Sequence, residues 1–189
     1  MAEAKKSDLT RKRILDSGRA LLLRNRLSGV GPVRIPAEIQ APKGSFYYYY
    51  FVSKEAFGTA LYADYVESYL ERIDVLIAGP GTSGEKLDRF WDAWPAQSGS
   101  VGTAGECLVV KLGAEVADLS NNMRDTLDQG VDALCGRIAR LLLGGSKHGR
   151  VRVFNAPQAA ACMLYPKWLG AAVLVKLASN DTGLRRART

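Results

Sequence analysis

Cysteine and lysine side chains offer the clearest chemistry in this sequence, and Cys107 is the best placed of the three cysteines. It follows a run rich in glycine and stands in the first turn of a predicted helix. The dipole of that helix would stabilise a thiolate, and Lys111, one turn further on, would add positive charge. Such a thiolate reacts with electrophiles, or is oxidised to a sulfenic acid that a nearby amine or thiol can trap. The alternative is a small, inert, buried side chain.

The other two cysteines and the single histidine indicate no second reactive centre. Cys135 and Cys162 lie within apolar helical stripes, so we expect both to be packed in the core. There is no Cys-x-x-Cys pair, and His148 stands in a basic loop. The spacing therefore predicts neither a zinc site nor a disulfide framework, and we expect no metal and no cofactor.

A run of aromatic residues between two lysines raises a second question. The stretch APKGSFYYYYFVSKEAFG, residues 41–58, sets four tyrosines between a Pro-Lys-Gly turn and a Ser-Lys-Glu helix start. Such a run is either a buried strand or a surface that binds a negatively charged partner. Residues 1–54 hold eleven basic and four acidic residues, an excess that equals the net charge of +7 of the whole chain. This concentration of charge favours a nucleic-acid-binding module.

The elements that must position these residues are all predicted to be helices, because strand alternation is nowhere sustained. Two short helices joined by a tight turn within residues 32–51, with longer helices on both sides, predict a helix-turn-helix head. Ser53 is predicted to cap the helix that follows. The other predicted helices cover residues 9–25, 53–78, 85–94, 106–119, 121–145 and 156–178, with a linker at 79–84, a loop at 98–105 and a frayed tail at 179–189.

Length and composition limit where such a protein works. The chain has 189 residues, of which 47% are apolar, enough for a full core. No apolar run is long enough to predict a membrane span, and the charged N-terminal stretch lacks the apolar core of a secretory signal. We therefore expect a cytoplasmic protein with no membrane partner.

The head resembles the TetR family of transcriptional regulators. The resemblance rests on TRKRILDSG in the first helix and on residues 41–58, which follow the family pattern P-K-G-S-F-Y-H-Y-F-x-S-K-E with one residue more. It implies an all-helical protein with a helix-turn-helix domain at residues 1–52 and a helical effector-sensing and dimerisation domain at 53–189. Phe46 is expected to point inward, and the residues expected to contact DNA are Lys43, Gly44, Ser45, Tyr47, Tyr48 and Lys54.

The body resembles a subgroup of this family that senses electrophiles and oxidants through a cysteine. The matching segments are residues 105–130 and 164–177. The resemblance implies that Cys107 is the sensor and that Lys176 is its amine neighbour. It also implies that the last helices pair two copies across a two-fold axis, so that the homodimer binds a near-palindromic operator in double-stranded DNA.

The sequence thus predicts a repressor that is released from its operator when an electrophile or oxidant reacts at Cys107. One alternative is a TetR-type repressor whose inducer binds reversibly. A pocket for a small molecule would then be lined by Trp91, Trp94, Tyr165 and Trp168. A more distant alternative is a cysteine-dependent detoxifying enzyme, although no histidine or second cysteine is placed as a base or resolving group.

Overall fold

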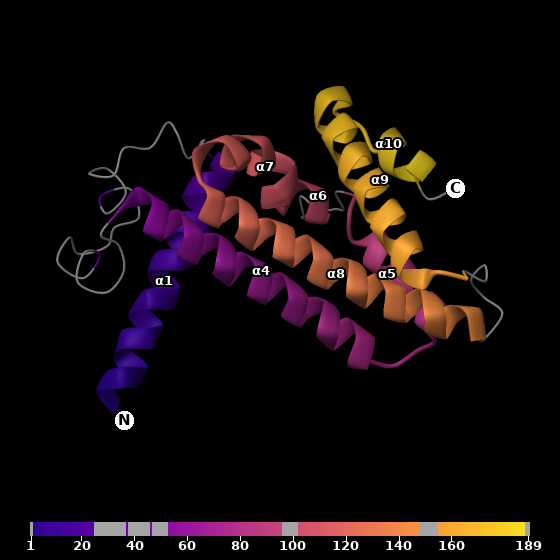
Figure 1. The fold of residues 1–189 in the computed structure, drawn as a ribbon, viewed down its shortest axis with the longest axis horizontal. Helices are drawn as coiled ribbons and strands as arrows, with labels where there is room; N and C mark the ends of the chain where they lie inside the picture. Colours follow the sequence, from indigo (N-terminus) through magenta and orange to yellow (C-terminus); the bar gives the residue numbers. More distant parts are fainter. Residues whose placement is uncertain are drawn as a thin grey trace. The chain divides into compact units, whose positions relative to one another are not determined.

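The computed structural model describes residues 2–24, 53–95, 102–147 and 155–187, together with Ala37 and Phe46. Every regular element in these ranges is a helix, as predicted (Figure 1). The helices form two compact units that do not follow the order of the chain. The first unit comprises residues 1–67 and 112–127, and the second unit comprises residues 68–111 and 128–189. The proposed domain boundary between residues 52 and 53 borders a stretch outside the described residues, so it stays a prediction.

The first unit is built on the packing of α1 (Ala2–Arg24) against the beginning of α4 (Lys54–Ala78). Gly18 makes the close approach possible, because a Cβ atom there would lie 2.5 Å from the Phe57 ring and 2.8 Å from a methyl group of Leu61. Apolar residues of α1 at helical spacing face this contact. The buried ones are Ile14, Leu15, Leu21 and Leu22.

Side-chain caps fix the starts of two helices. The Ser53 hydroxyl accepts from the Ala56 amide at 3.0 Å, which confirms Ser53 as the cap of α4. Thr82 and Glu85 form a capping box that starts α5 (Ser83–Asp92). The predicted linker at residues 79–84 is therefore a short, hydrogen-bonded turn that leads directly into α5.

The core of the second unit is a cluster of aromatic side chains. Trp91 of α5 stacks on Trp168 of α9 (Pro157–Ala178), with ring centroids 4.5 Å apart and planes at 14°. Trp94 is fully buried beside them. Within this unit α4 and α8 (Asn121–Lys147) lie side by side (Figure 1), and Arg137 of α8 donates to Asp74 of α4 at 2.9 Å.

Two predictions of irregular structure are wrong. The loop expected at residues 98–105 contains α6 (Gly102–Glu106), which is held because the Thr103 amide donates to the Ala93 carbonyl at 2.8 Å. The tail expected to fray contains α10 (Thr182–Ala187), which buries Leu184 and Ala187 in the second unit. In both segments tertiary contacts stabilise a short helix that its own sequence would not.

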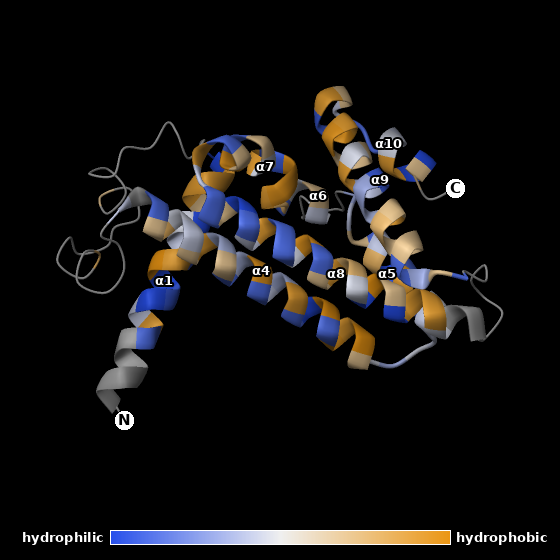
Figure 2. Ribbon diagram, viewed as in Figure 1, coloured by the Kyte–Doolittle hydropathy of each residue, from blue (hydrophilic) through white to orange (hydrophobic). Residues whose placement is uncertain are grey.

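The long helix α9 is apolar around much of its circumference (Figure 2). By length and hydropathy it would be able to cross a membrane, although the sequence analysis found no such run. One face buries Tyr165, Trp168 and Ala172 in the second unit. Another face exposes apolar side chains, with Met163 76%, Leu174 59% and Leu177 78% accessible; we call this the α9 stripe.

Candidate sensor site and DNA-binding head

The predicted DNA contacts fall largely outside the described residues. Lys43, Gly44, Ser45, Tyr47 and Tyr48 lie there, as does the additional residue of the tyrosine run. Lys54 begins α4, but only its backbone is described. These DNA contacts therefore stay predictions.

Phe46, between them, is described and confirms its predicted inward orientation. Its side chain is 3% accessible, and its ring lies 5.4 Å from that of Phe57, tilted by 54°. Phe57 also packs against Gly18 of α1. Phe46 thus packs on the same aromatic ring that docks α1 on α4.

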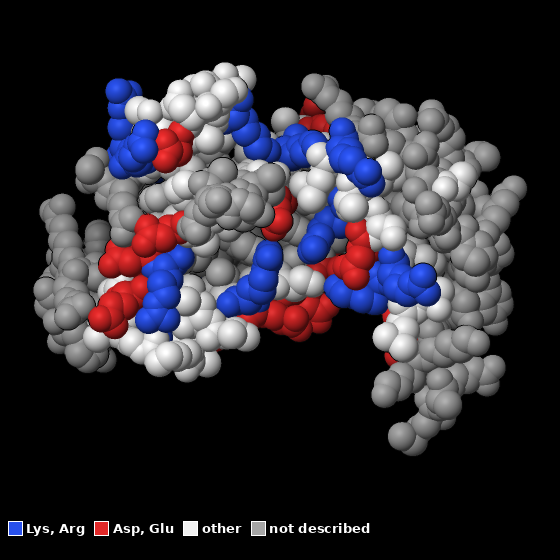
Figure 3. All heavy atoms as spheres, turned by 180° about the vertical axis from the view of Figure 1, so that it is seen from behind, with Lys and Arg blue, Asp and Glu red and all other residues white. Residues whose placement is uncertain are grey.

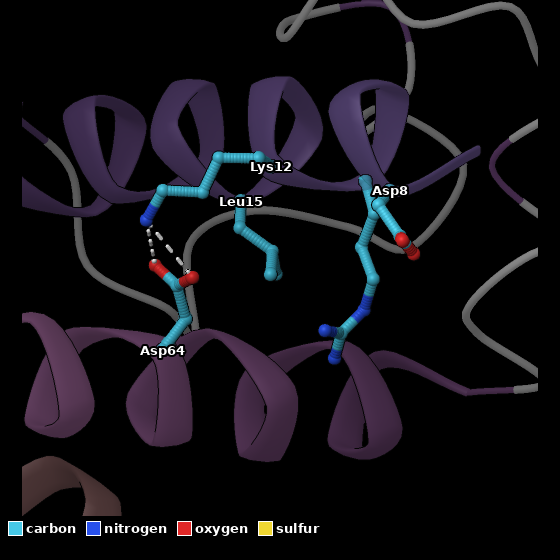
Figure 4. A pocket seen from close by; sticks show the side chains of 5 residues that line it. Asp8, Lys12, Leu15 and Asp64 are labelled. Atoms are coloured by element: carbon cyan, nitrogen blue, oxygen red, sulfur yellow. Dashed lines mark hydrogen bonds and ion pairs between the residues drawn. The ribbon is translucent and has the colours of Figure 1, made fainter. Parts of the chain in front are cut away.

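Not all of the basic residues near the head are available to bind phosphate. Lys12 of α1 reaches Asp64 of α4 (Figure 4), with its Nζ 3.0 and 3.1 Å from the two carboxylate oxygens. Burial opposes the charge on Lys12, but its bonds to Asp64 outweigh this effect and raise the Lys12 pKa. The contact lies beside a cavity of about 170 Å³ lined by Asp8, Arg11, Lys12, Leu15 and Asp64. On the face seen in Figure 3, basic and acidic side chains of the described residues lie interspersed.

Glu55, in the first turn of α4, is tied to the start of α8. The Ser120 hydroxyl donates to a Glu55 carboxylate oxygen at 2.6 Å and accepts from the Met123 amide at 3.2 Å. Ser120 thus caps α8 and also links the start of α8 to α4 through Glu55. The sequence analysis did not identify this link, although a serine directly before Asn-Asn-Met is a recognisable cap signal.

Cys107 lies between α6 and α7 (Leu108–Leu119), directly before α7 and not within its first turn as predicted. Its carbonyl accepts from the Lys111 amide at 3.1 Å, so it is the residue that starts α7. The side chain is 3% accessible. This placement brings the thiol close to the amino end of α7, as the sequence analysis expected, but in a shielded position.

Lys176, 69 residues away in the chain, lies within electrostatic reach of Cys107. Burial lowers the pKa of the Lys176 ammonium group, and the nearby Cys107 and Lys111 shift that pKa in opposite directions, upward and downward respectively. The three residues predicted to form the sensor therefore lie in the second unit, with Cys107 and Lys111 within electrostatic range of Lys176, and their role as a sensor stays a prediction.

Tyr69 of α4 is a neighbour of the thiol that the sequence analysis missed. Burial raises the pKa of its phenol, the charge of Cys107 raises it further, and Arg72 opposes this effect. The Arg72 guanidinium stands 5.4 Å from the centre of the Tyr69 ring. No local pattern marks Tyr69, because its relation to Cys107 is a long-range contact.

Tyr69 also lines a cavity of about 270 Å³ in the second unit. Two arginines, Arg72 and Arg89, and the ring of Phe90 contribute to the same wall. The remaining lining residues are Ile73, Leu76, Ala93 and Thr103. The wall of this cavity combines apolar surface with positive charge. Tyr69, which interacts with Cys107, is part of that wall.

The four aromatic residues predicted to line a ligand pocket fill the core instead of this cavity. Their accessibility is 7% or less, and Tyr165 packs edge-on against Trp94 with centroids 6.1 Å apart. Among the residues described, Trp94 Nε1 is buried without a hydrogen-bond partner. Their role in ligand binding stays a prediction. The four are Trp91, Trp94, Tyr165 and Trp168.

The remaining cysteines differ from each other. Cys135 is buried, as predicted, but Cys162 is exposed, so the prediction of a core position is wrong for it. The reason is that α9 is apolar on both its buried and exposed faces, so its composition does not reveal which side is buried. His148 is outside the described residues, and within them no cluster of three potential metal-binding side chains occurs.

Comparison with known proteins shows which family shares this sequence and architecture. The family description "Tetracyclin repressor-like, C-terminal domain" matches residues 83–189. The HTH-type transcriptional repressor NemR of Escherichia coli K12 is 33% identical over 94% of this chain and 89% of its own length. The HTH-type transcriptional repressor DhaR of Mycobacterium sp. GP1 is 26% identical over 90% of this chain and 84% of its own.

Solved structures agree with these sequence relatives. A TetR/AcrR-family transcriptional regulator superposes with a TM-score of 0.83 at 37% identity, covering 95% of this chain and 94% of its own. The reduced form of E. coli NemR gives 0.82 at 31% identity, covering 94% and 92%. The relatives and the fold are those of transcription regulators, which are not enzymes. This chain therefore belongs to the TetR family of transcriptional regulators and is a transcriptional repressor.

Proposed function

We propose that this repressor leaves its operator when an electrophile or a two-electron oxidant reacts with Cys107. The observation that carries the proposal is that Lys176 of α9 lies within electrostatic range of Cys107 and Lys111, which stand one turn apart at the start of α7 in the second unit. Lys111 and Lys176 supply positive charge and an amine within electrostatic range of the thiol. A solved relative, NemR of E. coli, is described in a reduced form, which is consistent with redox chemistry in this branch of the family.

The chemistry follows from the neighbours of the thiol. An electrophile adds to the Cys107 sulfur, which loses its proton to solvent. A peroxide or hypochlorous acid instead transfers oxygen to the sulfur, giving a sulfenic acid and water or chloride. The neutral amine of Lys176 then attacks that sulfur, an S–N bond forms, the S–O bond breaks and water leaves. Because partial burial lowers the Lys176 pKa, a larger fraction of this amine is neutral than for a lysine with its ordinary pKa.

The DNA-binding form is proposed to be a cytoplasmic homodimer that holds two recognition segments for a near-palindromic operator. The α9 stripe is the surface proposed to pair, since Met163, Leu174 and Leu177 expose apolar area that a second copy would cover. Contacts at the starts of α4 and α8, through Glu55 and Ser120, offer a route by which the body would act on the head. Sedimentation of the purified protein tests the dimer, because a monomer at assay concentrations contradicts it.

The test is a gel shift with DNA from the region upstream of the gene, at fixed salt, with and without N-ethylmaleimide or hypochlorite. We expect either reagent to weaken binding about tenfold or more in the wild type, within the usual range of allosteric coupling. Cys107→Ser should bind normally and keep its affinity after treatment. Lys176→Met should lose the response to hypochlorite but keep the response to maleimide. Lys167→Met, an exposed lysine on the same helix, is the matched control.

A reversible inducer is the second candidate function, and the cavity beside Tyr69 favours it. Arg72 and Arg89 would pair with the carboxylate of a small molecule, while Phe90 and Ile73 would contact its apolar part. The same gel shift separates the two proposals. Release of Cys107→Ser from DNA by an unreactive inducer would support the reversible mode and contradict the covalent one.

A further inference from the structure

An ion pair in the first unit links two helices whose paired residues are 52 positions apart in the chain. Lys12 Nζ of α1 lies 3.0 and 3.1 Å from the two carboxylate oxygens of Asp64 of α4 (Figure 4). It lies 3.6 Å from Asp16, one turn further along α1, so Lys12 reaches mainly across to α4 and not along its own helix. The Asp64 side chain is only 17% accessible, and its carboxylate would therefore be poorly compensated without Lys12.

The ion pair lies beyond the close contact at Gly18. There the absent side chain lets α1 approach the ring of Phe57. Lys12 and Gly18 are six residues apart, which is about 9 Å along a helix axis. A single point of contact leaves α1 free to tilt about it, whereas a second contact about 9 Å away fixes the angle between the two helices.

Apolar packing does not fill the space beside the ion pair. A cavity of about 170 Å³ lies there, and Leu15 is the apolar part of its wall. Its other lining residues are charged: Asp8, Arg11, Lys12 and Asp64. Because this cavity leaves room for α1 to shift, the bond between Lys12 and Asp64 is what holds the two helices together at this point.

The angle of α1 bears on the DNA-binding head through aromatic contacts. The Phe57 ring meets Gly18 of α1, and its centroid lies 5.4 Å from that of Phe46. Phe46 stands among residues 43–48, the stretch predicted to contact DNA. A tilt of α1 about Gly18 would therefore displace Phe57, and Phe46 with it.

We propose that Asp64 is a positioning residue for operator binding. By holding Lys12 it keeps α1 in the orientation in which the head fits DNA, and Lys12 itself serves as a link between helices and not as a phosphate contact. A repressor without this bond keeps the binding orientation for only part of the time, and its apparent affinity falls by that fraction. The inference depends on the DNA binding of a repressor and is independent of the chemistry proposed at Cys107.

The signs of two single substitutions test the proposal. Gel shifts with DNA from the region upstream of the gene compare Lys12→Met and Asp64→Asn with the wild type, at several salt concentrations and well below each melting temperature. We expect both variants to bind about twofold to fivefold more weakly, which is the worth of a partly exposed ion pair. The dependence of log K on log salt should stay that of the wild type.

A phosphate contact by Lys12 predicts a different pattern. Asp64→Asn would then strengthen DNA binding, because it removes a negative charge and releases the lysine. Lys12→Met would weaken binding and reduce the salt slope by about one. Either of these two results overturns the proposal.

A double substitution and a matched control complete the test. Lys12→Met/Asp64→Asn should bind no more weakly than the weaker single variant, because both changes remove the same bond. Glu67→Gln, at an exposed position one turn further along α4, removes the same charge and should keep the affinity of the wild type. The proposal is also overturned if the two single losses add, if Glu67→Gln binds as weakly as Asp64→Asn, or if the variants melt earlier while their folded protein binds with unchanged affinity.

Discussion

The two compact units are held together in different ways. In the first unit α1 docks on α4 through one narrow contact, where Gly18 meets Phe57 and Leu61, with Lys12 and Asp64 bonded at its edge. In the second unit the stacked rings of Trp91 and Trp168 form the centre of an aromatic core with Trp94 and Tyr165. The first contact depends on the missing side chain of one glycine, while the second depends on the volume of large rings. One substitution in each unit tests this difference.

Truncation of the aromatic core should have the largest effect. Trp168→Ala removes the ring stacked on Trp91 and leaves a cavity that the surrounding helices fill only in part. We expect a loss of about 3–5 kcal/mol in the free energy of unfolding. Urea denaturation followed by far-UV circular dichroism measures it. Trp168→Phe keeps a ring in this position and should lose clearly less; equal losses in the two variants would mean that stacking and volume do not govern this unit.

The next largest effect is expected where α1 packs on α4 at Gly18. Adding a methyl group there should destabilise the protein, whereas the same change at a control glycine should stabilise it. Gly18→Ala places a Cβ atom within 2.5 Å of the buried Phe57 ring, so we expect a net loss of about 1–2 kcal/mol. Gly136→Ala on α8 meets nothing within 4 Å and should stabilise the protein by about 0.5–1 kcal/mol, the usual gain of alanine over glycine in a helix.

Operator binding sharpens this comparison. Because Phe57 also contacts Phe46 of the recognition segment, Gly18→Ala should weaken DNA affinity along with stability, whereas Gly136→Ala should not. Thermal unfolding measures the stability of the two variants, and a gel shift on the same proteins measures their DNA affinity. Stabilisation by Gly18→Ala would show that α1 and α4 are not in close contact at this point.

Local patterns were sufficient to predict much of this fold. The stripe of α1, the Ser53 cap and the inward Phe46 all follow from spacing, turn chemistry and the head motif, which are properties of short segments. The short helices α6 and α10 were missed because distant partners stabilise them, such as the Ala93 carbonyl for Thr103 and the core around Leu184.

The candidate sensor site shows the same limit more sharply. Helix position alone made Cys107 a candidate, but Lys176 was suggested only by resemblance, since no spacing rule connects residues so far apart. Tyr69 was not foreseen as a neighbour of the thiol. The exposure of Cys162 was mistaken because an apolar helix that buries one face and exposes another gives no periodic signal.

The smallest effect expected concerns an ion pair at the margin of the second unit, where Arg137 bonds to Asp74. Hydrogen bonds from Arg137, and the charges of Arg137 and Arg140, hold the pKa of Asp74 below its ordinary value of 3.8. A carboxyl group with a lowered pKa stabilises the folded protein at pH values above the unfolded-state pKa, and this stabilisation is lost as pH falls through the folded-state pKa.

Asp74→Asn should therefore lower the free energy of unfolding by about 0.2–1 kcal/mol near neutral pH, because the pair is partly exposed. Urea midpoints for wild type and variant should converge well below pH 3.8, whereas Asp118→Asn, at an exposed position on α7, should track the wild type throughout. If the urea midpoint of Asp74→Asn stays below that of the wild type in acid, the loss of stability is due to altered packing and not to charge.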